Sequence, residues 1–298
     1  MSIAILCGGL GGSRCVDSLA RAAGPEAVTA IGNVGDDVEI LGLHVSPDLD
    51  TVLYTLAGLL DEERGWGVRD ETYSALAMVG ALGGETWFTL GDRDIGLHLV
   101  RTRWLREGIP LSEVTFRLAQ ALGVRVRLLP ATDDPLRTKI ETEGDELDFQ
   151  EWFVGRGHRE AVHGVRFAGA EDATPAAGVL NAIEDAELVV IAPSNPFVSI
   201  FPILAVAGIR QALAEKRVAA ISPLVGGRAL RGPLVQMMKS LGHEPNSAGI
   251  AALYGDLVDL VVVAPGEEPP PGGVTSDIVM VDPSTREEVG RTLLEALL

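Results

Sequence analysis

The sequence predicts an α/β fold: a Rossmann-like, mostly parallel sheet with a helical insertion and a small β-hairpin. The chain has 298 residues and opens with an apolar run, a glycine-rich turn, a helix-length segment and a second apolar run. This order is typical of a βαβ unit, which requires a parallel sheet. The same alternation returns in the last third of the chain, whereas the middle is mainly helical.

The opening unit consists of a strand at 2–7, a turn at 8–12, a helix at 13–23 and a second strand at 27–31. In the last third, apolar runs and amphipathic segments alternate. Ser284 is expected to cap the final helix, whose Val289, Leu293, Leu294 and Leu297 share one face. The expected elements there are strands at 186–191, 218–221, 257–263 and 277–281, and helices at 202–215, 233–241 and 247–254.

The middle of the chain has helical periodicity followed by short strand-like runs. We expect one α/β domain over residues 1–298, with approximately 51–150 as an insertion packed over the strand ends. The expected helices are 51–60, 71–82, 95–107 and 111–122, and the expected strands are 125–129, 137–142 and 146–149.

Composition excludes several classes of protein. The formal charge of −18 argues against broad nucleic-acid binding, which needs many Lys and Arg side chains. No apolar run reaches the roughly 20 residues that span a bilayer, and the N-terminal run lacks the basic region of a secretory signal. The only cysteines, Cys7 and Cys15, form neither a disulfide framework nor a zinc site. We therefore expect a cytoplasmic protein that binds neither nucleic acid nor membrane.

Four glycines follow the first strand, in the segment CGGLGGSR: Gly8, Gly9, Gly11 and Gly12. Glycines before a helix let the backbone approach a phosphate, and the helix N-terminus favours negative charge. The segment departs from G-x-G-x-x-G because Arg14 stands at the last glycine position, and it lacks the P-loop lysine. A tight turn without a ligand explains the pattern about equally well.

Two acidic turns come next. Asp36 and Asp37, in GNVGDD, suit Mg²⁺, which takes one or two carboxylates together with substrate phosphate oxygens. Backbone preferences of Asp and Asn in turns are the alternative. In SPDLDT, Asp48 or Asp50 could cap the following helix, which does not explain both.

A charged turn, Asp92-Arg93-Asp94, follows the apolar run WFTL. A purely structural interpretation is an N-cap by Asp92, with Arg93 paired to a neighbour. Two further turns, APSNP and SPLVGG, follow strands directly and contain Ser194, Asn195, Gly226 and Gly227. Turns at the carboxyl ends of parallel strands lie where open α/β sheets bind ligands, so these turns and the first two segments predict one ligand crevice. No serine or cysteine nucleophile motif is present.

The order and text of these motifs resemble the family of 2-phospho-L-lactate transferases. The matching segments run from Cys7 to Gly227: CGGLGGSR, GNVGDD, SPDLDTVLYTLAG, RGWGVRDET, WFTLGDRDIGLHLVRT, ATDDPLRT, FQEWFV, APSNPFVSI and SPLVGG. Nine segments in sequence make the resemblance specific.

The resemblance implies a Rossmann-like core with a helical insertion, a homodimer and Mg²⁺ as cofactor. It implies transfer of a phospho-C3-acid from a guanosine diphosphate-linked donor to the deazaflavin FO, with release of GMP, in coenzyme F-420 biosynthesis. Because phosphoryl transfer depends on positioning and charge neutralisation, no strong base is expected.

By the same resemblance, Asp50 and Arg93 match positions that contact FO, and Asp50 would orient the attacking hydroxyl as the catalytic residue. The metal is expected on Asp36, Asp37 or Asp50. No role is expected for Cys7 or Cys15. The residues expected on the nucleotide side are Gly8, Gly9, Gly11, Gly12, Ser194, Asn195, Gly226 and Gly227.

Two alternatives remain open. One is a sibling protein of the same fold without FO transferase activity, although siblings lack the FO-contacting pair that Asp50 and Arg93 supply here. The other is a nucleotide-binding regulator without catalysis, which would leave the acidic turns without a use. The sequence also leaves open whether the donor carries lactate, the enol of pyruvate or glycerate.

Overall fold

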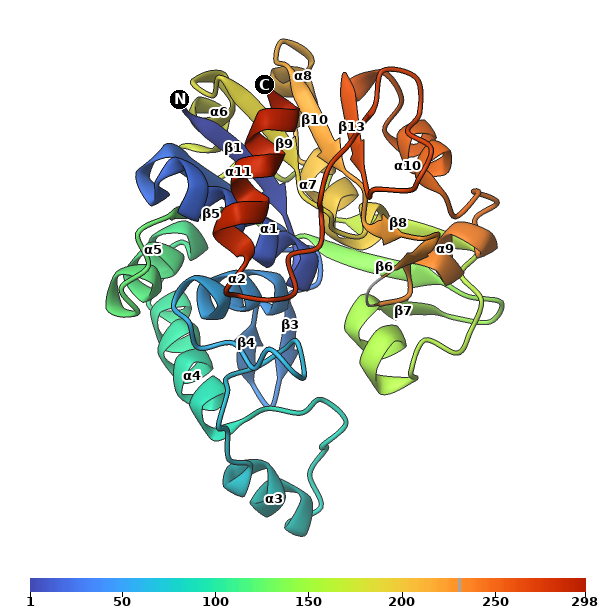
Figure 1. Cartoon of the computed structure of the whole chain (residues 1–298). Coiled ribbons are helices and arrows are strands. Elements are labelled where there is room, and N and C mark those ends of the chain that lie inside the picture. The colour runs from blue at the N-terminus through green and yellow to red at the C-terminus, as the bar shows by residue number, and fades with distance from the viewer. Residues whose placement is uncertain (230–231) are drawn as a thin grey trace.

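A seven-stranded parallel sheet forms the centre of the molecule (Figure 1). The structure is a computed structural model that describes residues 1–229 and 232–298. Every neighbouring pair in this sheet is parallel. The strands, in order across the sheet, are β14 (Val274–Thr275), β13 (Leu260–Val263), β10 (Val218–Ile221), β9 (Leu188–Ile191), β1 (Ile3–Cys7), β2 (Val28–Gly32) and β5 (Arg127–Pro130).

The chain begins in the middle of the sheet and reverses direction there. It starts at β1, moves outward to β2 and β5, and returns to β9 on the other side of β1. Ile3 of β1 is therefore in register with both Val28 and Leu188. The strands β1, β9, β10 and β13 are entirely buried, as expected for a parallel sheet covered on both faces. The boundary between β1 and β9 is the topological switch point, where such sheets bind ligands.

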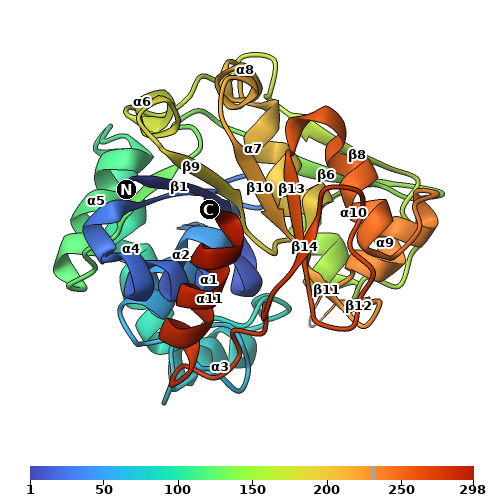
Figure 2. The ribbon, with the colours of Figure 1, turned by 45° about the horizontal axis from the view of Figure 1, so that its top comes forward.

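Helices cover both faces of the sheet (Figure 2). On one face α11 lies along α1, and Gly290 allows this close contact because a Cβ there would lie 2.1 Å from the carbonyl oxygen of Ser18. On the other face lie α6, α7 and α8. The helices of this part of the fold are α1 (Gly9–Ala23), α6 (Val179–Glu184), α7 (Phe201–Ala205), α8 (Ile209–Ala214), α9 (Leu234–Ser240), α10 (Ser247–Tyr254) and α11 (Arg286–Leu297).

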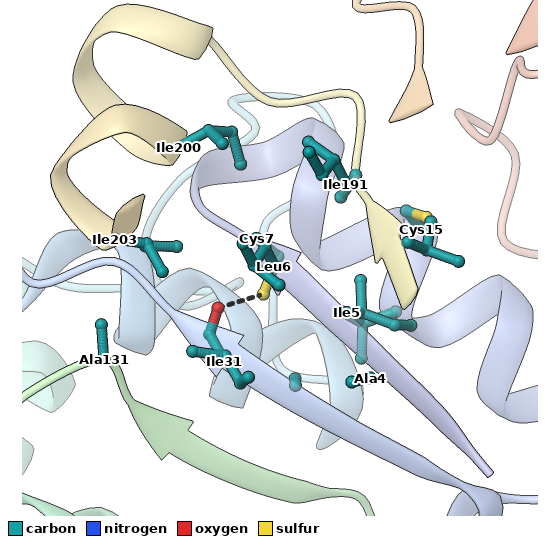
Figure 3. Packing of buried hydrophobic residues seen from close by; sticks show 14 of the residues in the cluster. Ala4, Ile5, Leu6, Cys7, Cys15, Ile31, Ala131, Ile191, Ile200 and Ile203 are labelled. Carbon is teal, nitrogen blue, oxygen red and sulfur yellow. Dashed lines mark hydrogen bonds between the residues drawn. The ribbon is translucent and has the colours of Figure 1, made fainter. Parts of the chain in front are cut away.

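The two cysteines belong to the hydrophobic core, where Cys7 ends β1 and Cys15 lies in α1. The Sγ of Cys7 lies 3.7 Å from the carbonyl oxygen of Ile31, among the isoleucines drawn in Figure 3. Burial raises the pKa of Cys7 well above its usual value and that of Cys15 to about 12. Both therefore remain thiols at neutral pH and act as small apolar side chains.

The remaining elements lie outside the central sheet. In Figure 1, α3 projects from the bottom of the molecule. These elements are the hairpin β3 (Val38–Ile40) and β4 (Leu43–Val45), the helices α2 (Pro47–Leu56), α3 (Ser74–Ala81), α4 (Asp92–Arg106) and α5 (Leu111–Ala121), the antiparallel strands β6 (Arg137–Glu141), β7 (Glu146–Asp148) and β8 (Gly164–Ala168), and the hairpin β11 (Leu224–Val225) and β12 (Arg228–Ala229).

The predicted α/β class, with its mostly parallel sheet, is confirmed, and several details differ. The strand expected near 125–129 is β5, the edge strand of the main sheet, so the range 51–150 is not one continuous insertion. The hairpin of β6 and β7 carries a third strand, β8. The glycine segment is not a separate turn, because α1 already begins at Gly9.

Two predictions near the C-terminus were wrong. Residues 277–281 alternate as in a strand, with Ile278 and Met280 buried and Val279 and Val281 half-exposed, yet the last strand of the sheet is β14. This alternation arises from packing against the body of the protein. Ser284 does not cap α11, since its backbone N–H and its hydroxyl both donate to Asp282.

Candidate functional site

A cavity of about 860 Å³ opens at the carboxyl ends of the strands on both sides of the switch point. Its wall includes residues that follow β1, β2, β9 and β10, so the four turns predicted to share a crevice do meet. Cavities of this size are typical of small-molecule sites. These wall residues are Gly8, Gly9 and Gly11 after β1, Asp36 after β2, Pro193, Ser194 and Asn195 after β9, and Ser222, Pro223 and Val225 after β10.

The glycines at the start of α1 permit close contacts with neighbouring segments. A Cβ on Gly8 would lie 2.1 Å from a carboxylate oxygen of Asp48, and one on Gly11 would lie 2.2 Å from the carbonyl oxygen of Pro193. The hydroxyl of Ser194 accepts from the Gly8 N–H at 3.1 Å and donates to the Gly8 carbonyl at 2.8 Å. The glycine segment therefore joins β1 to the turn after β9, and close packing explains it without a ligand.

Asp48 and Asp36 are the buried carboxylates on the wall of this cavity, and the amide of Asn33 links them. The Asn33 Nδ2 lies 2.9 Å from Asp48 and 3.2 Å from Asp36. Asp48 also accepts from the Gly9 N–H at 2.6 Å, and Asp36 accepts from Gln150 at 3.0 Å. The start of α1, the turn after β2 and the start of α2 thus converge on two acids.

Burial and nearby negative charges raise the pKa values of these two acids. Burial raises the pKa of Asp48 to about 6, although hydrogen bonds from Asn33 and Gly9 oppose the shift. Burial raises the pKa of Asp36 well above its usual value, and the nearby charges of Asp48 and Asp37 raise it further. A divalent cation would relieve this repulsion.

The pair fits the ligand preferences of Mg²⁺, which binds one or two carboxylates and completes its shell with water and phosphate oxygens. Within residues 1–229 and 232–298, no group of three or more His, Cys, Asp or Glu side chains is arranged to hold a metal ion by itself. A cation at Asp36 and Asp48 would therefore need oxygen ligands from the substrate.

The other two acids expected at the metal have partners within the protein. One oxygen of Asp37 accepts from the Ser46 hydroxyl at 2.9 Å and lies 2.9 Å from the His44 ring. Asp50 forms a two-pronged ion pair with Arg101, one arm of which measures 2.9 Å, and both side chains are buried. Neither acid is on the wall of the large cavity.

The Asp92-Arg93-Asp94 turn joins two helices. The carboxylate of Asp92 accepts from the Ser74 and Ala75 N–H groups, so it caps α3 and not its own helix. Glu71 in turn accepts from the Arg93 N–H at the start of α4. The side chain of Arg93 is exposed, donates to the carbonyl of Arg69 and lines a second cavity of about 400 Å³.

Three glycines expected on the nucleotide side lie off the large cavity. Gly226 and Gly227 have φ values of +60° and +69° and form the turn between β11 and β12, where both central residues of a tight hairpin take positive φ. Gly12 packs against Ser194, since a Cβ there would lie 2.7 Å from its hydroxyl oxygen.

Sequence reasoning missed much of the cavity wall. Asp48 is absent from the residues expected to bind the metal, although one helix cap does not explain both acids of SPDLDT. Gln150 lies in the matching segment FQEWFV, but nothing in the sequence indicates that it reaches Asp36 across 114 positions. An apolar aromatic part of the wall was also missed, and it consists of Trp66, Phe88, Phe149 and Phe153.

The sheet order and the cavity at the switch point define a Rossmann-like α/β protein with a candidate small-molecule site. The chain belongs to the family described as 2-phospho-L-lactate transferase CofD, whose model matches residues 3–296, and the protein is thus a transferase of that family. This confirms the resemblance seen in the motifs. In the described part of the chain, no helix has the length and apolar character needed to cross a membrane.

Curated relatives match over nearly the whole chain. A phosphoenolpyruvate transferase from Streptomyces griseus is 42% identical, with 99% of this chain and 98% of the relative covered. A 2-phospho-L-lactate transferase from Methanospirillum hungatei is 35% identical, with 99% and 100% covered. A crystal structure of a UPF0052-family protein from Bacillus halodurans has a TM-score of 0.55 at 20% identity, covering 91% of this chain and 82% of that one, and supports the fold.

We expect Asp50→Ala to destabilise the protein by about 3–5 kcal/mol, because it leaves the buried Arg101 guanidinium without its partner. Loss of a helix cap alone would cost about 1 kcal/mol. Arg93→Ala, at an exposed site, should change stability by no more than about 0.5 kcal/mol. Urea unfolding of the three proteins measures both effects. Equal stability of Asp50→Ala and the wild type would contradict the ion-pair assignment.

The raised pKa of Asp48 predicts how stability depends on pH. A buried acid with a raised pKa binds its proton more tightly in the folded state, so its contribution to stability falls as pH rises from about 4 to about 6. The metal-free wild type should therefore lose stability relative to Asp48→Asn over this window. Hydrogen bonds from Thr174 lower the pKa of Asp134. The wild type should therefore gain stability relative to Asp134→Asn as pH rises through the range where Asp134 ionises. Parallel pH curves for wild type and Asp48→Asn would refute the assignment.

Proposed function

We propose that this protein transfers a phospho-C3-acid group from a guanosine diphosphate-linked donor to the deazaflavin FO, releasing GMP, in the biosynthesis of coenzyme F-420. The observation that carries the proposal is the pair of buried carboxylates, Asp36 and Asp48, on a cavity at the switch point of a chain in this family. Phosphoryl transfer requires a place where phosphate charge is neutralised and the reactants are aligned.

The nucleotide side of the cavity is proposed to be the start of α1 and the turn at Ser194 and Asn195. The N-cap residue of α1 is Gly8, which has no side chain to cap the first turn. A helix start of this kind favours an anion through its N–H groups and its dipole. Gly9, Gly11 and Asn195 lie on the same wall.

Asp36 and Asp48 are proposed to hold Mg²⁺, in place of the expected set of Asp36, Asp37 and Asp50. When bound, the ion supplies positive charge to the phosphate oxygens of the donor. Gln150 and Asn33 orient the two carboxylates through the hydrogen bonds described above. A transition state of metaphosphate character does not demand a strong base for the attacking hydroxyl.

The aromatic part of the wall is proposed to hold the deazaflavin ring system. Trp66 is 43% exposed, and its large apolar surface faces a cavity that also contains Phe88, Phe149 and Phe153. Flat conjugated ligands gain from burial against such side chains. The contacts of FO with Asp50 and Arg93, which the family resemblance implies, remain a prediction. Asp50 is paired with Arg101, so it would contact FO only if that ion pair opened, or it would act on FO indirectly through Arg101.

The donor acid is proposed to be the enol of pyruvate. The relative named phosphoenolpyruvate transferase is 42% identical to this chain, compared with 35% for the relative named 2-phospho-L-lactate transferase. A homodimer in the cytoplasm is likewise proposed from the family resemblance.

The test is to incubate the metal-loaded protein with FO and each guanylated donor and to weigh the products. We expect a phosphodiester of FO and one equivalent of GMP, and no turnover in EDTA. Asp36→Asn and Asp48→Asn should each reduce kcat by at least about tenfold, because each removes a charge from the metal site. Asp37→Asn should lose less, and Glu85→Gln, at an exposed site, should match wild type. If the protein binds GDP but forms no product, the result would favour the alternative of a nucleotide-binding regulator without catalysis.

A further inference from the structure

A network of partly buried ion pairs borders the large cavity. Arg14 of α1 donates to Glu62 at 2.8 Å, and Arg286 of α11 donates to the other oxygen of Glu62 at 2.5 Å. Arg286 also donates to Asp17 at 3.1 Å, and Asp17 accepts from Arg21 at 2.8 Å. The connected groups are thus three guanidinium groups and two carboxylates, a surplus of one positive charge.

Arg14 is the member of this network best placed to meet a ligand. Its side chain is 9% exposed, and it lines the cavity together with Glu62. Its Nε is buried without a hydrogen-bond partner. Among the described residues that line the cavity, Arg14 is the only Lys, Arg or His. Asp36, Asp48 and Glu62 leave the same wall with an excess of acid.

We propose that Arg14 binds the carboxylate of the C3 acid carried by the donor, by exchanging Glu62 for that carboxylate. The inference rests on the proposed function, because it takes the donor to be a guanylated C3 acid. Arg14 is already paired with the carboxylate of Glu62, which is the same chemical group that the ligand would present. Guanidinium and carboxylate form strong charge-assisted hydrogen bonds, which can be two-pronged.

The network makes this exchange feasible. When Glu62 leaves Arg14 it keeps Arg286, and Arg286 also keeps Asp17. No buried charge is left without a partner, which is the situation that would otherwise carry the largest cost. Glu62 is also 32% exposed, so water can serve the oxygen that Arg14 releases.

The competing explanation is structural. The ion pair of Arg14 and Glu62 could serve only to fasten the loop after α2 to α1. In that case, loss of Arg14 would lower the melting temperature and would leave the preference for ligands with a carboxylate unchanged.

Calorimetry with three probes separates these explanations: the guanosine diphosphate ester of the pyruvate enol, its carboxamide counterpart, and GDP. Wild type should bind the carboxylate ester more tightly than the carboxamide by about ten- to a hundredfold, the value of one charge-assisted contact. Arg14→Met should abolish that preference and leave GDP binding near wild type. The matched control is Arg21→Met, which removes a guanidinium from the same network at a 47% exposed site away from the cavity.

A second variant keeps the test valid if Arg14→Met fails to fold. Glu62→Gln removes the competing charge, so it should increase the preference for the carboxylate ester several-fold. An unchanged preference in Glu62→Gln, or a preserved preference in folded Arg14→Met, would overturn the assignment. An equal loss for GDP and the ester in Arg14→Met would also overturn it, since the contact would then be to phosphate. If wild type binds none of the three probes, the proposed function itself fails.

Discussion

The site depends on a single buried amide, that of Asn33. Its N–H group donates to the carbonyl of Cys7 at the end of β1, and its side-chain oxygen accepts from Gly35. Its Nδ2 is directed at Asp36, Asp48 and the carbonyl of Val198. One fully buried side chain therefore fixes two acids that repel each other. If this amide were lost, Asp48 would keep the Gly9 N–H and Asp36 would keep Gln150, but no single donor would bridge the two acids.

The electrostatics of the cavity follow from this arrangement. The two acids are buried close together, so each carboxylate is harder to ionise. The pKa values of Asp48 and Asp36 are therefore raised. The same cavity contains the cationic Arg14, which is paired with the carboxylate of Glu62 through one of its terminal nitrogens. A ligand with a metal-bound diphosphate and a carboxylate would satisfy both features. Strain of this kind is typical of functional sites, where stability is lower than it could be.

The sequence predicted the features that depend on neighbouring residues, namely the strands and the turns that follow them. The apolar runs located every strand of the sheet except β14, and the turns that follow β1, β2, β9 and β10 were correctly expected to converge. Side-chain partners across long sequence separations were beyond reach, as for Gln150 with Asp36 and for Arg101 with Asp50, 51 positions apart. The SPDLDT segment illustrates the limit: the pattern identified two unusual acids, but only packing distinguishes cavity-facing Asp48 from ion-paired Asp50.

The placement of the metal at Asp36 and Asp48 can be tested with an anomalous difference map from crystals of the protein soaked in Mn²⁺ with GDP. Mn²⁺ accepts the same oxygen ligands as Mg²⁺ and can be located by its own scattering. We predict one strong peak between the carboxylates of Asp36 and Asp48, next to a phosphate oxygen. A peak at Asp37 or Asp50, with Arg101 displaced, or no peak in crystals that contain GDP, would contradict it.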